Sequence, residues 1–267
     1  MSTLRPWWGT VTVPLGETCR VVIGPLTLFA RRTPGLWELA ATQDRDPFVD
    51  TVTGPEPVDA DPAEVPGYRR IACEGDAAEI TLTPRTADRP VISRPEHPFV
   101  LPRRQSVVVY LSTPVWLSAS AGGTELVEIP CYRPSDTWFG PSPREGELCY
   151  ASRAFYRTHL DAAQRLPHRL YTEVEIRNEA GDALQLERLN LPAPYFSVFA
   201  AADASLWTER LCYVREGDGD MAPARIDPTP PKTLGETTPV SSPRQRHQEA
   251  LWVRAFSSLV DTGWLRW

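Results

Sequence analysis

Residues 8–41 read WGTVTVPLGETCRVVIGPLTLFARRTPGLWELAA, and this stretch decides the fold class. WGTVTV alternates polar and apolar side chains, as a half-buried strand does, and three further β-rich runs follow it. Turn-forming residues separate these runs, at positions 14–17, 24–25 and 33–35. The stretch therefore predicts a meander of short antiparallel strands.

The same pattern continues to residue 130. The runs YRRIAC, AEITLTP, SVVVYL, VWLSAS and TELVEIP have strand-like composition, and Gly122-Gly123 between the last two predicts a tight hairpin turn. An acidic, proline-rich segment at 43–67 reads instead as a surface excursion with little regular structure. We expect residues 1–130 to form a larger β-sandwich, jelly-roll-like or immunoglobulin-like, with antiparallel strands that have one wet face.

The second half predicts a smaller antiparallel unit and a helix. Between residues 131 and 230, alternating runs such as LYTEVEIRN favour an immunoglobulin-like sandwich. Residues 231–267 read as a linker followed by a C-terminal α-helix, because Ser242-Pro243 is typical of a helix start. Apolar residues then recur at near-helical spacing, and we expect this tail to make contacts through Trp252, Phe256, Trp264 and Trp267.

Composition narrows the class of protein. The 267 residues include 28 prolines, which argue against long helices, and nine tryptophans, which can fill a sizeable core. The net charge of −6 makes nucleic-acid binding an unexpected function. The longest apolar run, at 107–116, is too short to span a bilayer, and the N-terminal residues lack a signal-peptide core. Five cysteines without a CxxC pair predict reduced thiols in a cytoplasmic protein.

The sequence lacks the familiar catalytic and metal-binding motifs. No GxSxG, HExxH or clustered His/Cys pattern occurs, so we predict no catalytic residues, no metal site and no cofactor. The stretch of most chemical interest is 133–156, RPSDTWFGPSPREGELCYASRAFY. Its candidate binding surface consists of Asp136, Trp138, Phe139, Glu145 and Glu147.

These five residues have two interpretations each. Glu145 and Glu147 lie on one face of a strand, where they can hold a cation or act as an acid/base pair, or form a solvated face. Trp138 and Phe139 can stack on a partner or fill the junction between the two sandwiches. Asp136 can tie the turn that holds the aromatic rings.

Several segments together resemble a known family. RPSDTWFGP at 133–141, EGELCYASR at 145–153, PHRLYTEVEIRN at 167–178 and LERLNLPAP at 186–194 are similar to an uncharacterised prokaryotic family, domain of unknown function 432. The start WWGTVTVPLGETCRVVIGPLTLFARR and the late segment ALWVRAFSSL fit it as well, so the likeness covers nearly the whole chain. The resemblance implies a soluble prokaryotic protein and brings no catalytic residues with it.

Three function hypotheses follow. The first is a non-catalytic binding protein that recognises a protein or small molecule through loops at the junction of the sandwiches. The second is a hydrolase of carbohydrates or esters in which Asp136, Glu145, Glu147 and His97 converge. The third is an accessory protein, peripheral to a membrane or a channel, that uses the C-terminal helix. The sequence does not determine the oligomeric state.

Overall fold

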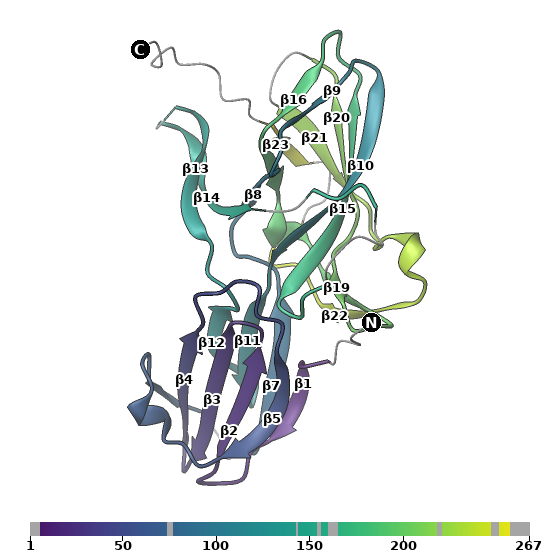
Figure 1. Ribbon diagram of the computed structural model, residues 1–267. Helices are drawn as coiled ribbons and strands as arrows, with labels where there is room; N and C mark the ends of the chain where they lie inside the picture. The colour runs from purple at the N-terminus through teal and green to yellow at the C-terminus, as the bar shows by residue number, and fades with distance from the viewer. Residues whose placement is uncertain are drawn as a thin grey trace.

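The computed structural model of the protein describes residues 6–73, 77–142, 144–153, 156–159, 165–217, 221–246 and 251–256. Nearly all of its regular structure is β-strand (Figure 1). The helical elements among the described residues are single turns of 3-10 helix, namely η1 (Pro62–Glu64), η3 (Ala193–Tyr195) and η4 (Lys232–Leu234). The prediction of a mostly-β protein is confirmed. No helix in these ranges is long and apolar enough to cross a bilayer.

Two antiparallel sheets form the first unit. The five-stranded sheet has the order β5-β2-β3-β4-β6, with β5 (Val52–Val58), β2 (Thr18–Ile23), β3 (Leu26–Thr33), β4 (Leu36–Gln43) and β6 (Arg69–Ala72). The four-stranded sheet has the order β1-β7-β11-β12, with β1 (Gly9–Thr12), β7 (Glu79–Arg85), β11 (Trp116–Ala121) and β12 (Thr124–Pro130). The predicted hairpin is present, because Ala121 of β11 pairs with Thr124 of β12 across the two glycines.

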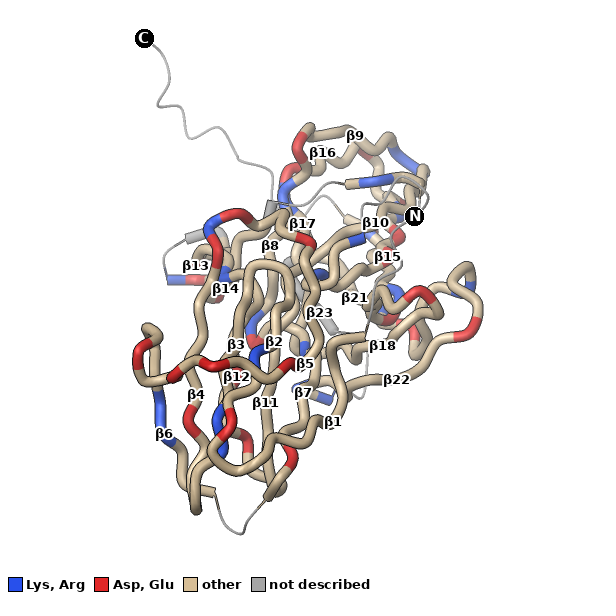
Figure 2. The backbone as a smooth tube through the Cα atoms, turned by 60° about the horizontal axis from the view of Figure 1, so that its bottom comes forward, with Lys and Arg blue, Asp and Glu red and all other residues tan. Residues whose placement is uncertain are grey.

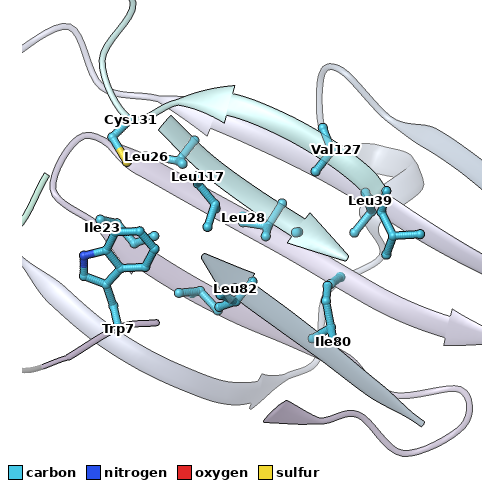
Figure 3. Close-up of a cluster of buried hydrophobic side chains, with 14 of the residues drawn as sticks. Trp7, Ile23, Leu26, Leu28, Leu39, Ile80, Leu82, Leu117, Val127 and Cys131 are labelled. Carbon is cyan, nitrogen blue, oxygen red and sulfur yellow. The ribbon is translucent and has the colours of Figure 1, made fainter. Parts of the chain in front are cut away.

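The core of the first unit lies between these sheets. Alternate apolar residues of β3 face inward, and Leu26 and Leu28 are 0% and 1% exposed. Figure 3 shows them meeting Leu82 and Leu117 of the other sheet, with Trp7 and Cys131 at one side. Because the strands alternate, each contributes one apolar row to this core and one polar row to the surface.

The second unit is built on an eight-stranded sheet of mixed direction. Its order is β22-β18-β19-β15-β20-β21-β23, and β10 pairs with β15. The strands are β22 (Thr237–Ser241), β18 (Val198–Ala201), β19 (Leu206–Trp207), β15 (Arg169–Asn178), β20 (Leu211–Arg215), β21 (Met221–Ile226), β23 (Leu251–Arg254) and β10 (Gln105–Pro114). A second hydrophobic cluster, which includes Val174, Tyr213 and Phe256, packs on this sheet.

Two smaller sheets complete the second unit. One has the order β13-β14-β8-β17, with β13 (Ser135–Ser142), β14 (Glu145–Arg153), β8 (Val91–Arg94) and β17 (Leu189–Leu191). The other pairs β16 (Leu184–Leu186) with β9 (Phe99–Leu101). Strands β8, β9 and β10 therefore pair with strands of the second half of the chain. The predicted domain limits at residues 130 and 230 stay a prediction.

Two parts of the predicted fold are wrong. The sheets are not purely antiparallel, because β14 pairs with β8, and β15 with β19 and β20, in parallel. The C-terminal helix is also wrong: residues 251–254 form β23, which pairs antiparallel with β21. Backbone groups along β21 gain interstrand hydrogen bonds from this pairing, and the apolar run LWVR suits a strand as well as a helix.

Residues 241–245, which include the predicted start of the helix, form hydrogen bonds and an ion pair that link the two units. Ser241 Oγ donates to the carbonyl of Pro84, and Gln245 N donates to the carbonyl of Pro194. Arg244 forms an ion pair with Glu128 and donates to the carbonyl of Thr86 at 2.9 Å through Nε. Figure 2 shows acidic and basic residues interspersed along both units, as such local pairing requires.

Candidate functional site

The five predicted site residues all lie on one hairpin, formed by β13 and β14. The hairpin extends away from the rest of the second unit (Figure 1). Its register pairs Asp136 with Tyr150 and Trp138 with Leu148. Side chains alternate across a strand, so these four residues share one face, which we call the hairpin outer face.

The hairpin outer face is anchored at one end and exposed at the other. At the anchored end, Arg89 Nη1 lies 3.2 Å from Asp136 Oδ1, and the Arg89 guanidinium lies 5.3 Å from the centre of the Tyr150 ring. Further along, Trp138 is 43% exposed and Leu148 is 46% exposed. The ion pair and the cation–π contact fix the base of the hairpin, and the apolar pair meets solvent beyond it.

Gly146 leaves room for the Trp138 indole to lie close to the backbone of the opposite strand. A Cβ added at Gly146 would lie 2.7 Å from Trp138 Nε1 and 2.7 Å from the carbonyl oxygen of Phe139. Such distances are too short for a methyl group. The sequence therefore places glycine where the ring crosses the opposite strand.

The opposite face of the hairpin is packed around Phe139. Phe139 is 2% exposed and forms a small cluster with Ile92 and Cys149. Glu147 lies opposite Phe139 in the register, and its carboxylate accepts a hydrogen bond from Asn190 Nδ2 at 3.3 Å. Glu147 stays exposed over much of its surface, but desolvation of its carboxylate raises its pKa, and the bond from Asn190 opposes that shift.

The structure separates residues that the sequence grouped together. Trp138 faces outward and Phe139 faces inward, so the two rings lie in different environments. Asp136 lies on the outer face and Glu147 on the opposite one, and Glu145 is exposed at the start of β14. The carboxylates do not converge as the two groups of a hydrolase would.

The predicted tail contacts have different positions. Trp252 lies on β23 opposite Pro223, and Phe256 is 1% exposed, with its ring centre 5.6 Å from that of Tyr213. Phe256 is therefore part of the core and offers no external contact. Trp264 and Trp267 lie outside the described residues.

A second polar cluster lies on the eight-stranded sheet, and none of its residues was among the predicted site residues. Tyr110 Oη donates to Glu173 at 3.0 Å, and Arg210 Nε donates to the same carboxylate at 2.5 Å. Trp207 packs beside them, with its ring centre 6.3 Å from Tyr110 and 5.3 Å from Tyr171. Burial and the bond to Glu173 raise the pKa of Tyr110 to about 12.

Only part of this cluster had a signal in the sequence. The alternation in LYTEVEIRN indicates that Tyr171 and Glu173 share a face. Their partners Tyr110 and Arg210 come from distant segments that only the sheet order brings together. Across the described residues, no three His, Cys, Asp or Glu side chains lie together as metal ligands would.

Comparison with known families gives one match. The model of a protein family of unknown function, DUF432, matches residues 7–261. The chain belongs to the DUF432 family. The suspected resemblance is confirmed, and both the hairpin and the Tyr110–Glu173 cluster lie inside the matched part of this DUF432 protein. No curated protein and no solved structure matches the chain.

Proposed function

We propose that this DUF432 protein is a non-catalytic binding protein that contacts a partner protein through the hairpin outer face. One observation carries the proposal: Trp138 and Leu148 form an exposed cross-strand pair on a hairpin whose other face is packed by Phe139. Tryptophan supplies a large contact area with few rotatable bonds, and it is enriched at the centres of interfaces. The rigid base would limit the entropy lost when a partner binds.

The arrangement favours this function over the two alternatives. A hydrolase is not supported, because Asp136 and Glu147 project from opposite faces of the hairpin. Attachment to a membrane through a C-terminal helix is not supported, because residues 251–254 are a strand of the sheet. A cytoplasmic location and a prokaryotic origin remain part of the proposal.

Quantitative affinity capture tests the proposal with a matched pair of variants. Trp138→Ser removes the exposed ring from the hairpin, and Phe48→Ser removes another exposed ring, 54% exposed, from a different region. We expect proteins captured by the wild-type protein and by Phe48→Ser to be depleted at least about tenfold with Trp138→Ser, as for the loss of an interface anchor. Identical capture by all three proteins, with unchanged circular dichroism spectra, would refute the proposal.

A further inference from the structure

An apolar pocket, which we call the junction pocket, lies where the two units meet, beside β18 and β22. Its volume is about 490 Å³, and none of the residues that line it is charged. Pro6 and Trp8 of the first unit form one side of the lining. Alanines at the β18–β19 turn and residues 238–240 of β22 form the rest. The pocket is large enough to receive a bulky side chain of another molecule.

The walls of the junction pocket are held in place by contacts within the protein. Trp8 packs edge-on against the buried Trp7, with ring centres 5.7 Å apart, and Trp7 Nε1 donates to the carbonyl of Pro167 at 2.9 Å. At the β18–β19 turn, Ala204 N donates to the carbonyl of Ala201 at 2.9 Å. Ala204 has a φ of 60°, where glycine would be less strained, and its methyl group belongs to the apolar lining. The pocket therefore needs little rearrangement to bind a partner.

The same chain carries an apolar surface that suits this pocket, the hairpin outer face. Trp138 and Leu148 are large and apolar, are partly exposed, and pair across β13 and β14. Figure 1 and Figure 2 both show this hairpin on the opposite side of the molecule from β22. One molecule therefore cannot bring its own hairpin to its own junction pocket, whereas a second copy can.

We propose that the junction pocket of one copy receives Trp138 and Leu148 of a second copy, so that copies associate head to tail. This inference rests on the proposed function, because it names a second copy as a partner of the hairpin outer face. A charged group in the uncharged lining would lose its hydration without gaining an ion pair, whereas an indole ring can pack on Trp8 and the alanine methyl groups. A patch that complements a pocket elsewhere on the same molecule gives this type of contact.

Sedimentation velocity of the full-length protein over a range of concentrations tests the contact. We expect association that continues beyond a dimer, because each complex leaves one hairpin and one pocket open. Trp138→Ser should weaken this association at least about tenfold, as for the loss of an interface anchor. Ala202→Glu should do the same, because it places a carboxylate at an exposed position of the lining. The matched controls Phe48→Ser and Ala202→Ser should associate like the wild type.

Mixing the two weakened variants distinguishes this contact from a symmetric one. Trp138→Ser keeps an intact junction pocket, and Ala202→Glu keeps an intact hairpin. Together they should form a one-to-one dimer with wild-type affinity and nothing larger, because both surfaces left open carry a substitution. Native mass spectrometry identifies the composition of that dimer. Thr238→Glu, at another exposed position of the lining, replaces Ala202→Glu if circular dichroism shows that the latter does not fold.

Three results would overturn the inference. The wild-type protein could stay monomeric up to about 1 mM, where even a weak contact is populated. Folded Ala202→Glu and Thr238→Glu could both associate like the wild type. The hairpin and pocket variants could both lose association and fail to form the mixed dimer. Each of these results leaves the proposed function standing if Trp138→Ser still loses captured proteins, so the two failures are distinguishable.

Discussion

Acidification should destabilise the protein through one buried histidine, His168. Its side chain is 0% exposed, and its Nε2 lies 2.9 Å from the carbonyl oxygen of Pro47, so this nitrogen carries the proton. Nδ1 has no hydrogen-bond partner among the described residues and faces Gly24, where an added Cβ would lie 2.2 Å from it. A second proton on the ring would therefore be buried without an acceptor.

The size of the effect follows from the pKa of His168. Burial lowers it from 6.5 to about 4, with a smaller contribution from Arg169 in the same direction. The unfolded chain takes up the proton as the pH falls below 6.5, but the folded protein does not until the pH approaches 4. The free energy of unfolding therefore falls with pH in this window, by about 2 kcal/mol between pH 7 and 5 and about 3 kcal/mol at pH 4.

Urea unfolding followed by tryptophan fluorescence measures this contribution. His168→Gln keeps a donor for Pro47 but cannot be protonated, so the stability difference between wild type and variant should shrink by about 2 kcal/mol from pH 7 to 5. Glu147 and Glu209 have pKa values raised by burial and act in the opposite direction, but they are present in both proteins and cancel. His97→Gln, at an exposed histidine, serves as the control for replacing a histidine by glutamine. Parallel curves for wild type and His168→Gln would refute the reasoning.

Three further predictions concern stability and can be checked by the same unfolding assay. Gly24→Ala should lower the free energy of unfolding by about 3 kcal/mol, because Gly24 has a φ of 55° and its new methyl group would meet His168. A decrease below about 1 kcal/mol would contradict this contact. Phe139→Ala should lower the free energy of unfolding by about 3 kcal/mol and Trp138→Ala by less than about 1 kcal/mol, because only the Phe139 ring is buried. Equal decreases for the two variants would contradict the assignment of the two rings to opposite faces of the hairpin. Arg244→Gln should lower the free energy of unfolding by about 2 kcal/mol, because it leaves Glu128 unpaired. The double variant Arg244→Gln with Glu128→Gln should regain part of this stability.

The sequence predicted the strands of the first unit because their two faces differ in polarity. One edge strand that contains proline was not predicted. This strand, β5, includes Pro55 and Pro57, and its residues were expected to lack regular structure. Proline is tolerated there because β5 lies at the edge of its sheet, where half of its backbone donors need no partner. Composition alone cannot distinguish such a strand from a loop.

The other differences come from contacts between distant segments. Parallel pairing of β15 with β20 depends on which strand lies next to it, and local periodicity is the same for either direction. The helix signal at Ser242-Pro243 was local, and the pairing of β23 with β21 outweighed it. On the hairpin, adjacency in the sequence suggested a common role for Trp138 and Phe139, whereas the strand period places them on opposite faces.

The position of β23 has a consequence for how the protein is made. Residues near the end of the matched family region are needed for three contacts. These are the pairing of β23 with β21, the bridge between Leu189 and Phe256, and the burial of Phe256. During translation, the second hydrophobic cluster stays open at β17 and Tyr213 until those residues have left the ribosome. The nascent chain therefore exposes part of that apolar surface from the synthesis of β17 until Phe256 has emerged, which makes it a substrate for chaperones that bind emerging chains.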